Sequence, residues 1–468
     1  MNPLAGRGLG GDGEPVVRIG IVLPQDGRSR LHLDLPDGEY ALAASGPPES
    51  AAQGLPKPRR LRNASLECQI AGTIVRVAVD GEAAGTAEAW SLGPAEGAGP
   101  AIEVADIVAG RGFHWQTITR QRIPGSLAVR NLAGALLLTA RLPLEEYLAG
   151  VITAEMSGRC PLDFLKAQCV VARSWTLAHT ERKHEKLGVD FCNDDCCQRY
   201  QGLGELTEVA RRAVAETRGE VLVVEPPLVP APRVVDANYS KSCGGITEAP
   251  EAIWGMAKPG LTAVVDAPPS SPLHGVLPLS EEAVGGYVAT ALPGCRDAFC
   301  GPGAVAEAEL PAYLGRVDTG GGFFRWSVSR EREELEELLR RKGYAPADLA
   351  ELTDLVVTDR GTSGRATAVE VAYRTAAGQR KAFTIRDQYA IRDALHETFL
   401  YSSAFAVRVE PDPLCPPRVA RVRLDGAGWG HGVGLCQIGA LGMALAGWGY
   451  RGILRHYFPT AGVAAAYA

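Results

Sequence analysis

The stretch LPLEEYLAGVITAEM, residues 142–156, decides the fold, because strand patterning ends here and helical patterning begins. A proline and two adjacent glutamates near its start suit the first turn of a helix. One face of this helix would be apolar, through Leu144, Tyr147, Leu148, Val151 and Ile152. We expect the helix to end near Gly158, because glycine commonly ends helices.

A second helix is expected directly after the first, in PLDFLKAQCVVARSW, residues 161–175. Pro161 suits a first helical position. Apolar side chains then recur at helical spacing, at Leu162, Leu165, Cys169, Ala172 and Trp175. The sequence therefore predicts a pair of consecutive amphipathic helices.

Strand patterning dominates the residues before this helical pair. Apolar residues alternate at Val17, Ile19, Ile21 and Leu23, which is the period of a half-buried strand. Strands and helices both recur after the pair, so the predicted class is α+β with a β-rich N-terminal module. We expect a disordered tail at residues 1–15 and the β-rich module at residues 16–120. A larger domain should follow at residues 121–468, with a Pro/Gly-rich insertion at residues 268–325.

Composition limits the kinds of partner that the chain can have. The 468 residues carry a net charge of −6, which argues against broad electrostatic binding to nucleic acid. The apolar runs are too short to span a bilayer, and the first residues, MNPLAGRGLGGDGEP, lack the apolar core of a secretory signal. We therefore expect neither a transmembrane helix nor a signal peptide in this sequence.

The eleven cysteines do not read as a disulfide framework, because their number is odd and they are scattered. A close group stands in HEKLGVDFCNDDCCQRYQG, residues 184–202. His184, Cys192 and Cys197 offer nitrogen and thiolate ligands that suit Zn²⁺, and Cys196 is an alternative ligand. We expect the zinc to be structural and to brace the loop. The residues alone are equally consistent with an ordinary group of cysteines in the hydrophobic core, without a metal ion.

Glu155 is the candidate acid–base residue. A carboxylate at the C-terminus of a helix, among apolar neighbours, feels the negative end of the helix dipole and partial desolvation. Both effects favour a protonated side chain that can act as an acid. Arg173 on the second helix is expected to hold this carboxylate or to bind an acidic substrate group. The alternative is a solvated helix-end glutamate paired with Arg173.

Two glycine-containing segments complete the candidate site. In NYSKSCGGITE, residues 238–248, the side chains of Ser240, Lys241 and Ser242 are candidates for binding a sugar or a carboxylate, although a tight turn explains the glycines equally well. In GAGWGHGVGLCQIGALGMA, residues 426–444, alternating glycines allow close backbone approach, and the candidate binding residues are His431 and Gln437.

The helical pair at 142–175 and the segments 184–202, 238–248 and 426–444, in this order, resemble the SpoIID/LytB family. The resemblance extends over roughly residues 129–463. It implies a glycan-binding cleft and a lytic transglycosylase in the cell envelope, active in sporulation or wall remodelling. The implied reaction cuts peptide-free peptidoglycan strands between N-acetylmuramic acid and N-acetylglucosamine. The family's catalytic glutamate falls on Glu155, its arginine on Arg173, and its zinc ligands on His184, Cys192 and Cys197.

Two other functions stay open. The LytB branch implies a non-catalytic protein that binds the wall and enhances an amidase, and an amidase or another wall hydrolase is then a partner. A hydrolase would instead need a second carboxylate beside Glu155. The candidates for that role are Asp236, Glu248 and Asp266.

Overall fold

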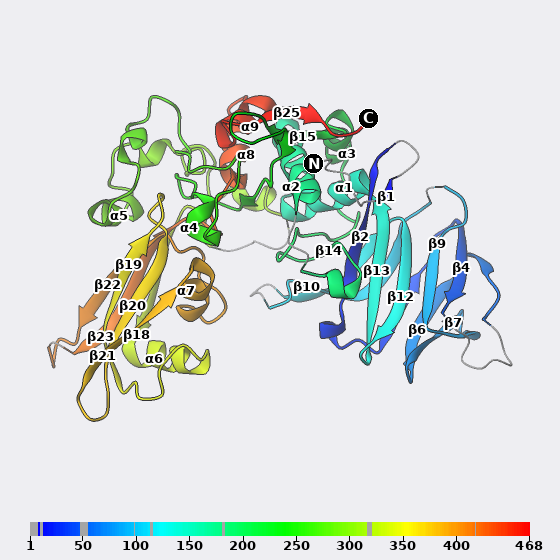
Figure 1. The fold of residues 1–468 in the computed structure, drawn as a ribbon, viewed down its shortest axis with the longest axis horizontal. Coiled ribbons are helices and arrows are strands. Elements are labelled where there is room, and N and C mark those ends of the chain that lie inside the picture. The colour runs from blue at the N-terminus through cyan, green and yellow to red at the C-terminus, as the bar shows by residue number, and fades with distance from the viewer. Residues whose placement is uncertain are drawn as a thin grey trace. The chain divides into compact units, whose positions relative to one another are not determined.

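The computed structural model describes residues 8–9, 13–46, 55–97, 99–112, 116–179, 183–315, 321–416 and 418–468. The chain forms two compact units (Figure 1). We call residues 2–159, 179–220 and 465–468 the β-rich unit, and residues 160–178 and 221–464 the mixed unit. The predicted α+β class with a β-rich N-terminal region is confirmed.

Two sheets form most of the β-rich unit. The first has the strand order β1 (Gly8–Leu9), β2 (Pro15–Val22), β13 (Ala135–Pro143), β12 (Ser126–Leu132), β9 (Ala89–Pro94), β4 (Glu39–Ser45) and β5 (Arg59–Arg62), and β14 (Phe191–Cys192) pairs with β2. The second has the order β11 (Thr117–Ile123), β10 (Ile102–Ala109), β3 (Arg30–Asp34), β6 (Ser65–Ala71), β7 (Ile74–Val79) and β8 (Glu82–Ala87).

The apolar residues that alternate along the sequence of β2 lie in the hydrophobic core of this unit. Val17, Ile19 and Ile21 on β2 have no solvent exposure, as expected for one face of a strand. The pairing of β13 with β2 is antiparallel, with Ala140 opposite Ile19. Apolar side chains from both strands therefore enter one buried layer.

The structure does not divide the chain at residue 120, where the sequence suggested a boundary. Strands β12 and β13 follow that position, yet they pair with β9 and β2 of the N-terminal region. The predicted tail, residues 1–15, lies partly outside the described residues. Within it, Gly8–Leu9 forms β1, which pairs with Pro15 and Val16, and Glu14 is buried.

The β-rich unit also contains α1 (Leu144–Glu155) and α3 (Glu208–Glu216), which pack against each other. α1 starts directly after Pro143, as predicted. Its Gly150 lies close to the ring of Tyr200, and a Cβ there would come within 2.4 Å of a ring carbon. The glycine therefore allows the segment around Tyr200 to lie against the helix.

The mixed unit starts with the second predicted helix, α2 (Leu162–Ala178), which packs against α8 (Gln437–Leu445) and α9 (Tyr450–Tyr457). Its antiparallel sheets have the orders β18 (Arg325–Glu331), β23 (Val419–Ala427), β22 (Phe405–Pro411), and β19 (Glu351–Arg360), β20 (Ala366–Arg374), β21 (Arg380–Arg386). Helices α6 (Arg332–Arg341) and α7 (Gln388–Ala394) contribute Leu338 and Ile391 to the hydrophobic core that these strands share.

Short elements complete the mixed unit. They are β15 (Glu220–Val224), β16 (Arg233–Val234), β25 (Gly462–Ala465), β17 (Tyr239–Ser240), β24 (Leu435–Cys436) and α4 (Pro250–Trp254). The predicted insertion, residues 268–325, contains α5 (Glu281–Val288), and its Leu273 and Tyr287 belong to a buried hydrophobic cluster. The described part of the insertion is therefore a packed part of the unit.

Candidate functional site

Glu155 is the last residue of α1, and its side chain is nearly buried, with 9% relative exposure. Its apolar neighbours Val151, Ile152 and Met156 have no exposure, as the sequence predicted. The backbone N–H of Arg199 donates a hydrogen bond to Glu155 Oε1 at 2.9 Å. The carboxyl group is thus at a helix C-terminus, in an apolar environment, with one oxygen fixed by a neighbouring loop.

The loop that fixes Glu155 is folded tightly on itself. The guanidinium of Arg199 makes a two-pronged contact with Asp195, with Nε–Oδ1 and Nη2–Oδ2 distances of 2.9 and 3.1 Å. The backbone N–H of Tyr200 donates to the carbonyl of Asn193 at 3.1 Å. The position of the Arg199 N–H, and with it that of the Glu155 carboxyl group, therefore depends on the conformation of residues 192–200.

The predicted metal ligands come together on this loop. One donor atom from each of His184, Cys192, Cys196 and Cys197 lies within 4.8 Å of the others, and we call these residues the loop donor group. The sequence offered Cys196 as an alternative ligand, whereas the structure includes it beside the other three. His179 instead packs against the ring of Phe191, with 5.6 Å between ring centroids.

The loop donor group could hold a metal ion, and its distances can be compared with those of a zinc site. Tetrahedral zinc with Zn–S bonds of about 2.3 Å holds its donors roughly 3.5–4 Å apart. The Sγ of Cys196 lies 3.7 Å from His184 Nε2 and 3.0 Å from the Sγ of Cys192, which is longer than a disulfide bond of about 2.05 Å. Hydrogen bonds from the thiols of Cys192 and Cys197, ahead of the effect of His184, lower the pKa of Cys196. This thiol is therefore ready to ionise, as metal binding requires.

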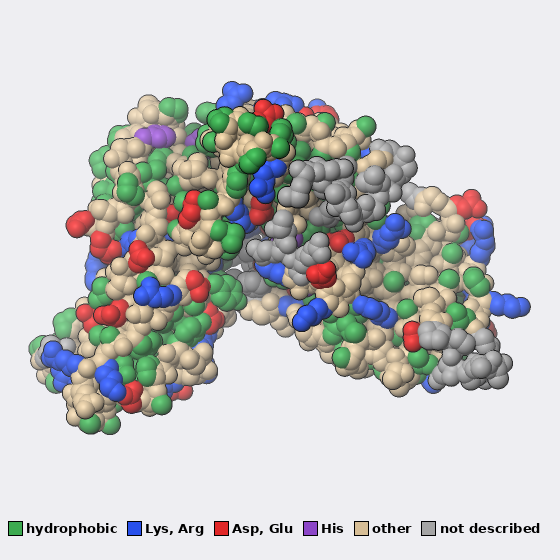
Figure 2. All heavy atoms as spheres, viewed as in Figure 1, with side chains coloured by type: hydrophobic (Ala, Val, Ile, Leu, Met, Phe, Trp, Pro, Cys, Tyr) green, Lys and Arg blue, Asp and Glu red, His purple; other side chains and the backbone are tan. Residues whose placement is uncertain are grey.

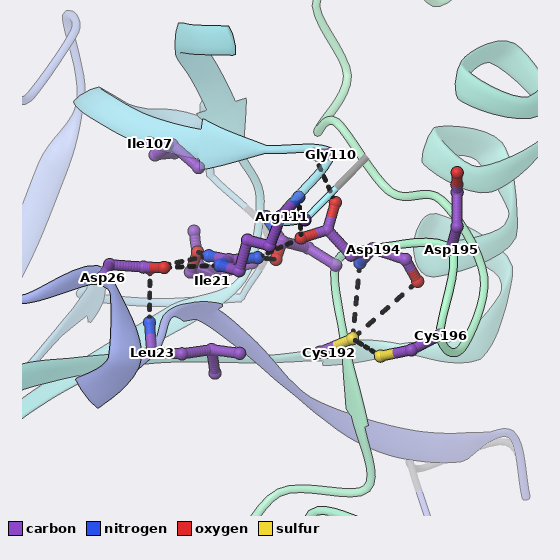
Figure 3. Close-up of polar contacts among 12 residues, drawn as sticks. Ile21, Leu23, Asp26, Ile107, Gly110, Arg111, Cys192, Asp194, Asp195 and Cys196 are labelled. Atoms are coloured by element: carbon purple, nitrogen blue, oxygen red, sulfur yellow. Dashed lines mark hydrogen bonds and ion pairs between the residues drawn. The ribbon is translucent and has the colours of Figure 1, made fainter. Parts of the chain in front are cut away.

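A buried arginine that sequence reasoning missed holds the same loop (Figure 3). Arg111 follows β10, and its guanidinium contacts Asp26 through Nε and Nη2 at 2.5 and 2.7 Å. Its Nη1 contacts Asp194 of the loop and also donates to Asn193 Oδ1 at 2.7 Å. The three charged side chains are at most 9% exposed.

Asp194 links this arginine to the loop donor group. Its carboxylate accepts from the Gly110 backbone N–H at 2.6 Å, and its own N–H donates to Cys192 Sγ at 3.4 Å. Burial raises the pKa of the Asp194 carboxyl group, while Arg111 acts in the opposite direction. No sequence signal paired Arg111 with Asp194, because 83 positions separate them.

The remaining predicted site residues belong to the mixed unit. Arg173 lies on α2 and has no solvent exposure. The expected pairing of Arg173 with Glu155 stays a prediction, as does the glycan-binding cleft.

The two glycine-containing segments lie side by side in the mixed unit. β17 pairs in parallel with β24, and the backbones of Ser242 and Trp429 exchange two hydrogen bonds of 3.1 and 2.8 Å. Gly244 and Gly428 adopt positive φ, and a Cβ on Gly428 would lie 2.7 Å from the Ser242 carbonyl oxygen. The glycines are therefore needed for the close approach of two backbones, which the sequence had suggested for the second segment.

Most predicted binding side chains in these segments are buried. Ser240 and Lys241 are 7% exposed, Gln437 is 1% exposed and Ser242 is not exposed. Their role as substrate-binding residues stays a prediction. His431 is partly exposed and lies beside the Trp254 ring, with 5.3 Å between centroids.

The histidine in the glycine-rich segment is neutral near pH 7. Desolvation by the surrounding protein atoms, followed by the positive charges of Arg392, Arg365 and Lys258, lowers the pKa of His431 to about 3. The Val433 backbone N–H donates to His431 Nδ1 at 3.0 Å, as a neutral ring allows. His431 therefore does not supply a positive charge for an acidic ligand.

The candidates for a second carboxylate have other partners. Glu248 is fully buried and accepts hydrogen bonds from both the backbone and the hydroxyl of Ser363. Asp266 is also fully buried, and Asp236 forms an ion pair with Lys258 at 2.7 Å. Both Glu248 and Asp266 are thus enclosed by protein, and this weakens the hypothesis that one of them is the second carboxylate of a hydrolase.

A pocket of about 480 Å³ lies in the mixed unit, between α5 and the β18–β23–β22 sheet. Its lining includes Arg325, Arg408, Arg423 and Asp425. None of the predicted site residues lines this pocket. On the face shown in Figure 2, both acidic and basic side chains are visible.

Comparison with known protein families identifies part of each unit. Residues 133–224 match the family model described as "Stage II sporulation protein" (SpoIID), and this stretch contains α1, α2 and the loop donor group. Residues 305–434 match a second model, "Domain of unknown function (DUF8618)". The second match overlaps the predicted insertion and continues to the glycine-rich segment.

Relatives found by sequence similarity agree with the first match. An uncharacterized protein of Brachyspira hyodysenteriae is 25% identical over 334 residues, which are 71% of this chain and 70% of that protein. The amidase enhancer of Bacillus subtilis is 26% identical, over 67% of this chain and 39% of its own length. Stage II sporulation protein D of Bacillus amyloliquefaciens is 28% identical, over 26% of this chain and 38% of its own length.

The alignments thus span less than half of each Bacillus relative. Together with the family match, they support the assignment of this chain to the SpoIID/LytB family, as its four motifs predicted. They also support a role related to the cell wall.

Proposed function

We propose that this protein is a lytic transglycosylase that cuts peptidoglycan strands, with Glu155 as the acid–base residue. The observation that carries the proposal is the setting of Glu155. A nearly buried carboxyl group at the end of α1, held by the Arg199 N–H, stands within the stretch that matches the SpoIID family. Burial and the helix terminus favour a carboxyl group that can donate a proton near neutral pH.

One carboxyl group suffices for this reaction. Glu155 donates its proton to the glycosidic oxygen as the bond from that oxygen to C1 of N-acetylmuramic acid breaks. The 6-hydroxyl of the same sugar attacks C1 and gives its proton to Glu155, so that a 1,6-anhydro ring closes. Because the nucleophile is already part of the substrate, no second residue has to position a water molecule.

The loop donor group would bind a structural zinc ion. His184, Cys192, Cys196 and Cys197 would provide all four ligands, so the ion would brace the loop and leave no coordination site for a substrate. The loop in turn carries the Arg199 N–H that fixes Glu155. Zinc would thus act on the reaction through the position of Glu155.

Peptide-free glycan strands test this activity directly. Purified protein incubated with them should release soluble fragments that end in 1,6-anhydro-muramic acid, which mass spectrometry detects. Strands that stay intact under conditions where the protein is folded and zinc-loaded would contradict the proposal.

The proposal also places the protein in the cell envelope, where its substrate occurs. Among the described residues, no helix is long and apolar enough to cross a bilayer.

The alignment with the amidase enhancer covers 67% of this chain and favours a second candidate, a wall-binding protein that stimulates an amidase. That function does not need Glu155. A purified wall amidase should then release peptides from peptidoglycan faster when this protein is added, with no cleavage of glycan. An unchanged amidase rate would exclude the second candidate for the amidase tested.

A further inference from the structure

Four metal-ligating side chains meet in the interior of the mixed unit, apart from every residue used above for catalysis. One donor atom from each of Cys243, Asp266, Cys300 and Cys436 lies within 4.8 Å of the others, and we call these residues the buried donor group. None of the four is more than 3% exposed. They come from separate segments: the turn after β17, the residue after Val265, the described part of the insertion, and the N-cap of α8.

The distances in the buried donor group suit a single ion. The Sγ of Cys243 lies 3.2 Å from Asp266 Oδ2 and 3.7 Å from the Sγ of Cys300. These values are close to the edges of a zinc-centred tetrahedron, about 3.5–4 Å. They are much longer than a disulfide bond, about 2.05 Å, and all of these cysteines are free.

The surroundings orient the donors as they would around a metal. The hydroxyl of Tyr457 donates to Asp266 Oδ1 at 2.6 Å, and the Nε2 of His456 lies 3.6 Å from the same oxygen. Oδ2 is the oxygen that faces the thiol of Cys243. Second contacts of this kind fix a carboxylate ligand and are typical of metal sites.

Backbone N–H groups point at the sulfur atoms. Cys436 Sγ accepts from the N–H of Cys243 at 3.1 Å and from the N–H of Gly439 at 3.3 Å. Cys243 Sγ accepts from the N–H of Gly245 at 3.3 Å. Such donors stabilise thiolates better than thiols, because a negatively charged acceptor makes the stronger hydrogen bond.

An ordinary apolar core explains this arrangement poorly. Buried cysteines often pack as small hydrophobic side chains, but here a carboxylate lies among them. A buried carboxylate costs free energy unless a positive charge or enough donors compensate it. The Tyr457 hydroxyl and the Cys243 thiol donate to Asp266, and His456 lies near it. A divalent cation between Asp266 and the three thiols would add a full positive charge to these contacts.

We propose that Cys243, Asp266, Cys300 and Cys436 bind one zinc ion as a second, structural metal site. With four protein ligands, the site is closed and has no catalytic role. The ion joins the turn at Ser242–Gly245 to the start of α8 and to the insertion. It therefore sets the geometry of the glycine-rich segment, whether or not Glu155 is catalytic.

The metal content of the full chain tests this site. Cys436→Ser is the most informative variant, because serine is a good N-cap residue and keeps the cap of α8, while a thiolate ligand is lost. Protein made in zinc-supplemented medium and analysed by plasma mass spectrometry should lose one zinc per chain in Cys436→Ser and in Cys300→Ala. Cys295→Ala, which removes another buried cysteine of the same unit outside the donor group, should keep the wild-type zinc content.

Equal zinc content in wild type and in Cys436→Ser overturns the proposal, as does a disulfide between Cys243 and Cys300 in protein purified without oxygen. A second measurement covers the case in which these variants do not fold. Cobalt(II) is added to a Cys192→Ser/Cys196→Ser/Cys197→Ser chain, which lacks all three loop thiolates but retains the buried donor group. A thiolate-to-cobalt charge-transfer band supports the site, and a folded chain without this band overturns it. Neither result depends on glycan cleavage, so a failure here is separate from a failure of the proposed function.

Discussion

The loop donor group and the buried donor group use similar side chains in different surroundings. In the loop donor group, Cys196 is exposed and His184 and Cys197 are partly exposed, whereas the buried donor group is almost fully enclosed. The first group spans 14 positions of the chain, from 184 to 197, and the second extends from 243 to 436. The comparison teaches that a local group can shape one loop beside the proposed acid–base residue, whereas a long-range group joins distant segments of a unit.

The largest expected effect concerns the residue that the loop serves. Glu155→Gln keeps an oxygen that can accept from the Arg199 N–H but removes the proton donor. We expect the rate of glycan cleavage to fall by about 10²–10⁴-fold, the usual contribution of general acid–base catalysis. Glu146→Gln, on the same helix and partly exposed, is the matched control and should keep the wild-type rate. Equal rates for both variants would remove Glu155 from the mechanism.

The second effect concerns the buried ion pairs of Arg111 with Asp26 and with Asp194 of the loop. Arg111→Met would leave Asp26 and Asp194 buried without their cation. Breaking a buried pair of this kind costs about 3–5 kcal/mol, so the free energy of unfolding from urea titrations should drop by that order. Arg18→Met breaks the more exposed pair with Asp190 and should cost less than about 1 kcal/mol. A smaller loss for Arg111→Met than for Arg18→Met would show that the buried network does not hold the loop.

The third effect separates the two donor groups. Cys196→Ser removes an exposed ligand of the loop donor group, so zinc should be lost from that group and cleavage should fall by about 10–100-fold through misplacement of Glu155. Activity and zinc content measured on the same protein sample check this. If zinc leaves and the rate is unchanged, the loop does not control Glu155.

Counted per pH unit, the smallest effect is a pH dependence in the mixed unit. The pKa of His431 is about 3 in the folded chain, below its ordinary value of 6.5. The unfolded chain therefore binds more protons between these values, and stability falls as the pH drops from 6.5 towards 3, by at most about 1.4 kcal/mol per pH unit. Urea titrations at several pH values should show a shallower dependence for His431→Gln than for wild type. Parallel curves for the two proteins would mean that His431 is as easily protonated when folded as when unfolded.

Local patterns in the sequence predicted the elements around Glu155 well. Pro143 and Pro161 marked the starts of α1 and α2 to within a residue, because proline suits the first helical turn. The spacing of the loop cysteines predicted their grouping, since residues only four or five positions apart cannot be far from each other. These predictions depended on contacts between near neighbours in the chain.

Long-range contacts decided what the sequence did not predict. The pairing of β13 with β2 moved the expected boundary at residue 120, and it joins strands more than 100 positions apart. Arg111, Asp26 and Asp194 come from three separate segments, and so do the thiols of the buried donor group. No periodicity or spacing in the sequence predicts these long-range contacts, because they depend on how sheets and loops pack in three dimensions.

The chemistry at Glu155 is tested most directly by cleavage of peptide-free glycan in water enriched in oxygen-18. Attack by the sugar's own 6-hydroxyl predicts 1,6-anhydro ends that carry no label and are lighter than reducing ends by one water. One new reducing end for each bond cut, in place of an anhydro end, would show that water is the nucleophile, and the single-carboxylate mechanism would then be wrong.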